Sequence, residues 1–74
     1  MTDWKRWLSR ARITDNPIGD LIADMRRDRK APASFAGIRD LRSYLARGSA
    51  SKAAVDGMWR RFKLWQQEER RRRS

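Results

Sequence analysis

Apolar residues recur at intervals of three and four positions in four separate segments of this chain. Such spacing places them along one face of an α-helix, and no segment shows the apolar-polar alternation that is typical of a half-buried strand. Short breaks rich in proline, glycine or serine separate the four segments. The sequence therefore predicts four helices and no sheet.

The first two expected helices have recognisable starts. The first covers about Asp3 to Arg12, with Thr2 as its N-cap. The second begins at Asn16 and Pro17, because asparagine accepts hydrogen bonds from free backbone amides and proline is tolerated at the first helical position. We expect this second helix to end near Arg29.

The third and fourth helices differ in length. The third is expected from about Phe35 to Arg47, with Ser34 as its N-cap and Gly48 as a left-handed stop. The fourth is the longest and runs from about Lys52 towards the C-terminus. We expect Glu68 and Glu69 to pair with Arg72 and Arg73, four residues further along, which would continue the helix into the arginine run.

The chain has 74 residues and no cysteine, so one small apolar core must hold the fold without disulfides. We expect one helical domain over residues 1–69 and a basic tail over 70–74 that can extend the last helix. The four tryptophans lie on the apolar stripes. Burial in the core therefore explains Trp4, Trp7 and Trp59 better than base stacking does, whereas Trp65 is left open.

Several short motifs follow one another in an order known from one protein family. They are, in chain order, Trp4, Trp7 and Leu8; Pro17, Ile18, Gly19 and Asp20; Asp24, Asp28 and Pro32; Ile38, Tyr44 and Leu45; and Trp59 and Phe62. The pattern resembles the YozE-type SAM-like family of small bacterial proteins over the stretch from Trp4 to Trp65. Ala31 and Phe62 depart from it, standing where the family usually has a large apolar residue and a tyrosine. The resemblance implies a compact, all-α, four- to five-helix SAM-like bundle with a long C-terminal helix, and it implies no particular function.

Charge and composition narrow the range of functions that the chain can have. Nineteen lysines and arginines against nine acidic residues give a net charge of +10, which favours polyanionic partners. The chain has neither histidine nor cysteine, so it lacks the usual near-neutral acid-base and thiol groups, and nothing pairs a nucleophile with a base. We expect a binding protein without cofactor rather than an enzyme.

Three aspartates on the second expected helix, Asp20, Asp24 and Asp28, form a carboxylate stripe. One turn of helix between neighbours is poor geometry for chelating a metal ion, so we expect no metal site. Arginines from neighbouring helices would compensate these like charges. Arg42 is the arginine that we expect to reach the stripe.

The densest positive surface is expected on the outer face and end of the fourth helix. A phosphate backbone is its natural complement, so the leading hypothesis is a nucleic-acid-binding or nucleic-acid-associated accessory protein of bacterial or phage origin. The alternative is a charged face that only keeps the protein in solution. The candidate contact residues are Arg60, Arg61, Arg70, Arg71, Arg72, Arg73, Arg6 and Arg10.

A protein-protein adaptor, regulator or inhibitor is the competing hypothesis. Ala53, Gly57 and Leu64 are expected opposite the core stripe of the fourth helix, where small residues would let another helix approach. The partner would then be an acidic protein surface or, in a homodimer, a second copy. The charged N-terminus and the absence of a long apolar run favour a cytoplasmic protein without a membrane partner.

Overall fold

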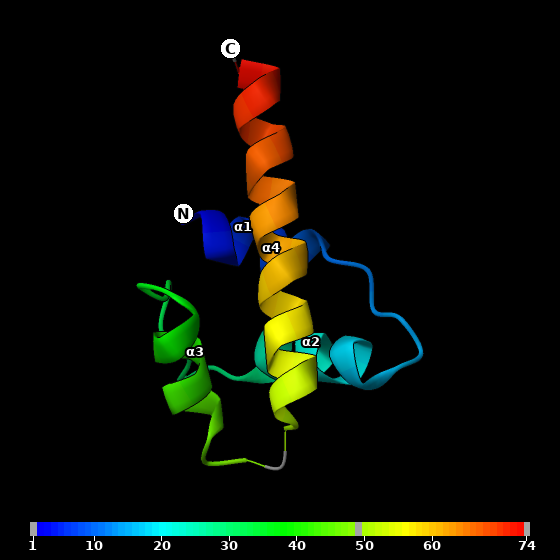
Figure 1. Ribbon diagram of the computed structural model, residues 1–74, viewed down its shortest axis with the longest axis vertical. Helices are drawn as coiled ribbons and strands as arrows, with labels where there is room; N and C mark the ends of the chain where they lie inside the picture. Colours follow the sequence, from blue (N-terminus) through cyan, green and yellow to red (C-terminus); the bar gives the residue numbers. More distant parts are fainter. Residues whose placement is uncertain (1, 49, 74) are drawn as a thin grey trace.

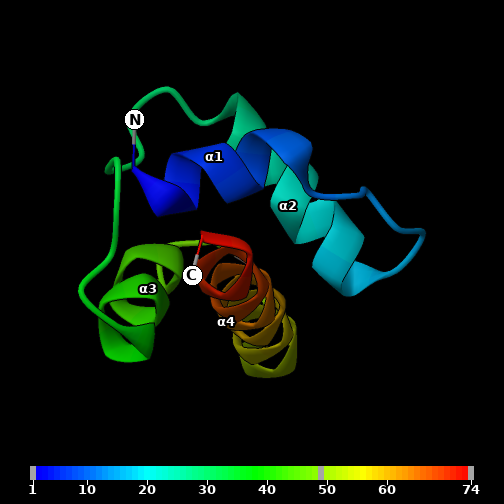
Figure 2. The same ribbon diagram turned by 90° about the horizontal axis from the view of Figure 1, so that it is seen from above.

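The computed structural model describes residues 2–48 and 50–73 of the chain. This part of the chain forms four helices: α1 (Asp3–Arg10), α2 (Pro17–Arg27), α3 (Ile38–Leu45) and α4 (Lys52–Arg73). Helix α4 is a long central rod that contacts each of the other three helices (Figure 1). Seen along α4, α1 and α2 lie together on one side of it, and α3 lies beside it (Figure 2). The expected all-α architecture with a long C-terminal helix is confirmed.

The two predicted N-caps of α1 and α2 are present. The Thr2 hydroxyl oxygen accepts a hydrogen bond from the Lys5 amide at 3.2 Å, and Asn16 Oδ1 accepts one from the Gly19 amide at 2.8 Å. Each side chain satisfies an amide that the first helical turn leaves without a partner. Both helices end two residues earlier than expected, at Arg10 and Arg27.

Helix α3 starts later than the sequence predicted. Ser34 is not its N-cap; Gly37 occupies that position and makes no side-chain capping bond. The cause lies one turn inside the helix, where the Asp40 carboxylate accepts a hydrogen bond from the Ala36 amide at 3.0 Å. This contact holds the chain before Gly37 in a non-helical conformation and leaves Phe35 free to pack elsewhere.

The end of α3 also differs from the prediction. The helix stops at Leu45, two residues before the expected Arg47, with Ala46 as a C-cap in right-handed helical conformation. No glycine among the described residues has a positive φ angle, so Gly48 is not a left-handed stop. Its amide instead donates to the Leu45 carbonyl at 3.1 Å, which closes a final turn.

The core lies where α1, α2 and α3 meet α4. Its buried side chains are Trp4, Trp7, Leu8, Leu21, Ile22, Met25, Leu41, Ala54, Val55, Met58 and Phe62. Trp4 and Trp7 are therefore core residues, as predicted. Trp59 and Trp65 pack against this core and remain partly exposed.

Arg42 does not reach the carboxylate stripe of α2, and that prediction is wrong. Its guanidinium instead binds Asp56 of α4, with Nη2–Oδ1 and Nε–Oδ1 distances of 2.8 and 2.9 Å. Helix α3 packs on α4, so the carboxylate nearest to Arg42 is on α4. In the stripe itself, Asp28 accepts a short hydrogen bond from the Tyr44 hydroxyl.

Candidate nucleic-acid interface

The second half of α4 leaves the core. All four fully buried residues of this 22-residue helix lie at or before Phe62, and Trp65 is the last side chain that packs on the core. A helix of this length measures about 33 Å, so several turns extend beyond the last buried residue. Figure 1 shows the C-terminal turns of α4 projecting past α1. Residues 70–73, expected as a tail, are the last turn of this helix.

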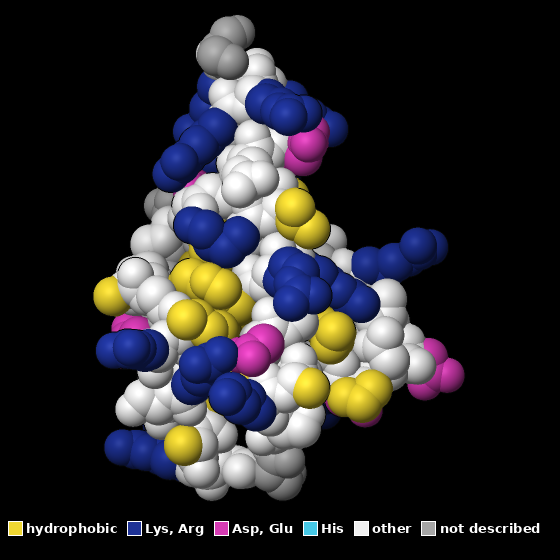
Figure 3. Space-filling model, in the orientation of Figure 1, with side chains coloured by type: hydrophobic (Ala, Val, Ile, Leu, Met, Phe, Trp, Pro, Cys, Tyr) yellow, Lys and Arg dark blue, Asp and Glu magenta, His cyan; other side chains and the backbone are white. Residues whose placement is uncertain are grey.

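Basic side chains dominate this projecting half. Residues 60–73 include seven lysines and arginines and only two acidic residues, Glu68 and Glu69. Both glutamates have a basic neighbour, but these are not the expected Arg72 and Arg73: Glu68 lies 3.6 Å from Arg71, and Glu69 lies 3.8 Å from Arg6. Figure 3 shows the resulting concentration of basic side chains around the upper part of the helix.

Four of the candidate arginines on α4 are exposed and have no side-chain hydrogen bond or ion pair among the described residues. Arg60, Arg70, Arg72 and Arg73 form no hydrogen bond or ion pair with any residue in the described part of the chain. Arg71 is also exposed and is held loosely by Glu68, since 81% of its side chain is accessible. Such pairs contribute little, so a stronger anion can displace the glutamate.

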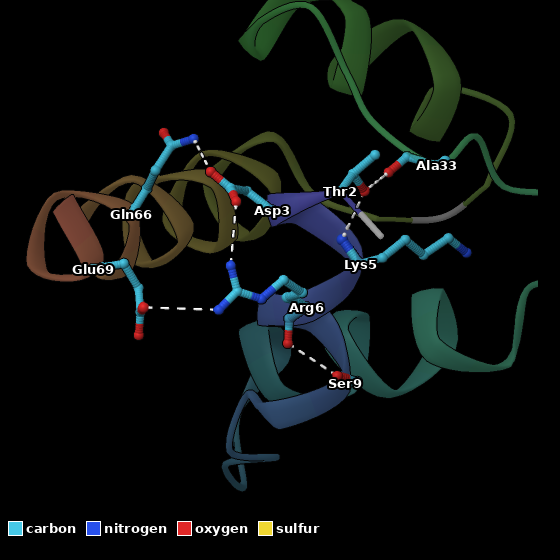
Figure 4. A network of polar contacts seen from close by, with 8 residues as sticks. All are labelled: Thr2, Asp3, Lys5, Arg6, Ser9, Ala33, Gln66 and Glu69. Carbon is cyan, nitrogen blue, oxygen red and sulfur yellow. Dashed lines mark hydrogen bonds and ion pairs between the residues drawn. The ribbon is translucent and has the colours of Figure 1, made fainter. Parts of the chain in front are cut away.

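Arg6 has a different position from the one expected of an interface residue. Its guanidinium lies 3.7 Å from Asp3, 3.8 Å from Glu69 and 5.6 Å from the centre of the Trp65 ring. Figure 4 shows the two ion pairs of Arg6 together with the hydrogen bond from Gln66 Nε2 to Asp3, which is 3.0 Å long. Arg6 therefore joins α1 to the projecting half of α4.

The ionisation of Asp3 responds to side chains of α4. The hydrogen bond from Gln66 is the main cause that lowers the pKa of the Asp3 carboxyl; desolvation opposes it, and the positive charges of Arg6, Arg73 and Arg70 lower the pKa further. Arg70 and Arg73 thus act electrostatically on a carboxylate at the start of α1.

Arg61 and Arg10 complete the predicted set. Arg61 is partly buried and donates a hydrogen bond from Nη1 to the Thr14 hydroxyl at 3.2 Å, so it ties α4 to the loop between α1 and α2. Arg10 is exposed in the last turn of α1. Of the predicted set, Arg60, Arg70, Arg72 and Arg73 on α4 and Arg10 on α1 form no side-chain hydrogen bond or ion pair within the described residues, whereas Arg6 and Arg61 have intramolecular partners.

The expected strip of Ala53, Gly57 and Leu64 is not a continuous open surface. A Cβ placed on Gly57 would lie 2.5 Å from the Cδ1 of Ile18, so this face of the glycine is covered by α2. Ala53 is exposed, and the Leu64 residue is 57% exposed. The lack of a side chain at Gly57 lets Ile18 of α2 pack closely against α4.

A cavity of about 250 Å³ lies between the start of α1, the segment before α3 and the middle of α4. Its aromatic lining consists of Trp4, Phe35, Trp59 and Phe62, and polar groups of Lys63 and Gln66 also line it. Figure 3 shows an apolar surface between α3 and α4 with basic side chains above and below it. Sequence reasoning missed this cavity, because helical stripes do not show where packing leaves a gap.

The carboxylate stripe of α2 borders a second, larger cavity of about 580 Å³ at the opposite end of α4. Asp20 and Asp24 are exposed there, beside apolar groups of Leu21 and Met25. Among the described residues, no group of three or more acidic side chains is arranged so that it could hold a metal ion. In the same part of the chain, none of the helices has the length and apolarity needed to span a membrane.

No family model, curated protein or solved structure matches the chain. The resemblance to the YozE-type SAM-like family therefore stays a prediction, and the functional argument depends on the geometry of α4 and its surroundings.

Proposed function

We propose that this protein binds nucleic acid without catalysis, through contacts between the phosphate backbone and the projecting half of α4. The observation that carries the proposal is the set of exposed arginines on α4 that form no side-chain hydrogen bond or ion pair within the described residues, three of which lie in the last turn of the helix. Arg60, Arg70, Arg72 and Arg73 form no side-chain hydrogen bond or ion pair among the described residues, and the ion pair of Arg71 with Glu68 is highly exposed. Guanidinium groups suit phosphate, because their planar donors match its oxygens.

The contacts within the protein also support this assignment. Arg42, Arg26 and Arg6 bind backbone carbonyls or carboxylates of their own chain, and these contacts stabilise the fold. The arginines at the end of α4 are beyond the last core contact, so their charge has no comparable structural use. Holding several of them on one helix creates a strong local potential for a polyanion.

A salt series of binding measurements tests the proposal. Backbone-led binding should weaken linearly in a plot of log affinity against log salt, and changes of base sequence should have little effect. Replacing Arg70, Arg71, Arg72 and Arg73 by glutamine should reduce the magnitude of the salt slope by up to about three, because each lost phosphate contact removes somewhat less than one unit.

The chain supplies a matched control of equal charge. Glutamine at Arg27, Arg29, Arg39 and Arg47 removes the same four charges from exposed positions outside α4. This control variant should keep most of the affinity. Equal losses in both variants would assign the binding to net charge alone, and the absence of affinity for any oligonucleotide at low salt would exclude the proposal. An acidic protein partner would then be the remaining use of the same arginines.

A further inference from the structure

The cavity beside the middle of α4 has a lining that the core does not explain. Trp59 and Phe35 are partly exposed there, although aromatic side chains of this size are the main source of burial in so small a domain. Trp4 packs behind them, 6.0 Å from Trp59 and 5.3 Å from Phe35 between ring centres, and the ring of Phe35 is edge-on to it. The cavity therefore offers aromatic walls that a flat apolar group can contact.

One wall contains an unsatisfied hydrogen-bond donor. Trp4 is 98% buried, given its relative exposure of 2%, and its indole Nε1 has no acceptor among the described residues. A buried donor without an acceptor is unfavourable by about 1–3 kcal/mol. The Nε1 atom is itself buried, so an acceptor can reach it only if the lining side chains shift.

A cation lies at the rim of the cavity. Lys63 Nζ is 6.0 Å from the ring centres of both Trp59 and Phe62, and it donates a hydrogen bond to Gln66 Oε1 at 2.8 Å. The amide of Gln66 is neutral and Lys63 forms no ion pair among the described residues, while the Asp3 carboxylate lines the same cavity and binds Gln66. The site thus combines aromatic faces with a cation at the edge, and the amide of Gln66 adds polar groups.

The rim continues into the arginines at the end of α4. Lys63, Gln66, Arg70 and Arg73 recur at intervals of three and four, so they lie along one face of the helix. The positive charges of Arg70 and Arg73 also lower the pKa of Asp3, which lines the cavity. Lys63 and Arg70 are two turns apart, about 11 Å along the helix axis.

We infer that the nucleic acid bound by α4 is single-stranded, and that one of its bases enters this cavity to stack on Trp59 while its phosphates follow Lys63, Arg70 and Arg73. The inference rests on the proposed function and adds the kind of strand and the base contact. A base supplies what the lining lacks: an aromatic face for Trp59 and hydrogen-bond acceptors at its edge. A duplex keeps its bases stacked inside and cannot offer one.

The experiment compares three probes of equal length: oligothymidylate, an abasic strand with the same phosphates, and a duplex. Oligothymidylate should bind about tenfold more tightly than the abasic strand, since stacking of one base on an aromatic side chain contributes an effect of this size. Trp59→Leu should remove the difference. Trp65→Leu is the matched control, because Trp65 is partly buried on the same helix but does not line the cavity.

Each result has a separate meaning. Equal affinity of the parent protein for the three probes, with dependence on Arg70 to Arg73 retained, would overturn the base contact and leave the proposed function intact. No binding of any probe would exclude both. The comparison of the three probes uses the parent protein, so it remains informative even if Trp59→Leu fails to fold. Lys63→Gln changes an exposed residue and should weaken the oligothymidylate and abasic complexes alike.

Discussion

The backbone of Gly19 lies so close to the backbone of Thr14 that a Cβ on the glycine would be only 1.7 Å from the Thr14 carbonyl oxygen. This contact arises because Asn16 caps the helix through the Gly19 amide and also accepts a hydrogen bond from the Thr14 hydroxyl. The loop before α2 is thereby folded tightly over the first turn of the helix. A side chain at Gly19 has no space.

Gly19→Ala should therefore destabilise the protein by about 1–3 kcal/mol, as overpacking typically does, despite the helix propensity of alanine. Denaturant unfolding measures this change. Gly57→Ala is the informative comparison, because the obstacle there is the Ile18 Cδ1 at the end of a side chain that can move. Gly57→Ala should lower the free energy of unfolding clearly less. Equal losses of stability at both positions would mean that the Thr14 backbone is not the obstacle at Gly19.

Arg26 is expected to stabilise the end of α1. Its Nε and Nη2 donate to the Leu8 carbonyl at 3.0 and 2.7 Å, and Nη2 also donates to the Ala11 carbonyl at 2.6 Å. These bonds satisfy carbonyls that the helix leaves free and place a positive charge at its negative end. Arg26→Met should lower the free energy of unfolding by about 1 kcal/mol or more. Arg27→Met, at an exposed neighbour, should change it little, and a larger effect at Arg27 would refute the capping role.

The ion pair of Arg42 and Asp56 should be visible in a double-mutant cycle. Each side chain is about a third or more exposed, so we expect a coupling free energy of about 0.5–1 kcal/mol between Arg42→Ala and Asp56→Ala. Arg39→Ala, which removes an exposed arginine from the same helix, should destabilise less than Arg42→Ala. Strictly additive effects of the two alanine substitutions would mean that the pair does not stabilise the contact between α3 and α4.

The contact between Tyr44 and Asp28 should give a dependence of stability on pH. The hydrogen bond from the Tyr44 hydroxyl, followed by the Lys30 amide, lowers the pKa of Asp28 below its usual 3.8, and the same bond raises the pKa of Tyr44 above 10.0. The stabilisation from the carboxylate is fully present above 3.8 and is lost as the pH falls through the lowered value. The stabilisation from the phenol is present below 10.0 and is lost as the pH rises through the raised value.

Tyr44→Phe should accordingly lower the melting temperature at neutral pH. The difference from the parent protein should shrink at strongly acidic and strongly alkaline pH, and thermal melts across the pH range measure it. A difference that stays constant at all pH values would indicate that the hydroxyl acts through packing alone.

The sequence was sufficient to predict the helix starts that depend on local contacts. Thr2 and Asn16 cap the turns directly after them, so residue type and position alone identified both starts. The start of α3 was different, since it depends on the Asp40 carboxylate reaching back to the Ala36 amide. Ser34 matched the preference for an N-cap residue equally well, and sequence alone could not choose between the two.

The candidate site was predictable in its charge and not in its shape. The arginine positions were evident, but whether an arginine has an intramolecular partner depends on residues far along the chain: Arg6 meets Glu69, and Arg61 meets Thr14. Helical spacing assigned Trp59 to the core, which it only partly joins. The cavity beside it results from how α1 and the segment before α3 meet α4, a tertiary arrangement that no stripe encodes.

The last turn of α4 lies beyond both Trp65 and Glu69, which are the last contacts of this helix with the core and with α1. Its backbone hydrogen bonds can open and re-form without disturbing the core, so its amides should exchange with solvent far faster than those around Met58. Substitutions in residues 70–73 are then nearly free of consequences for folding. Natural selection can adjust the charge of this turn to a partner while the rest of the protein stays unchanged.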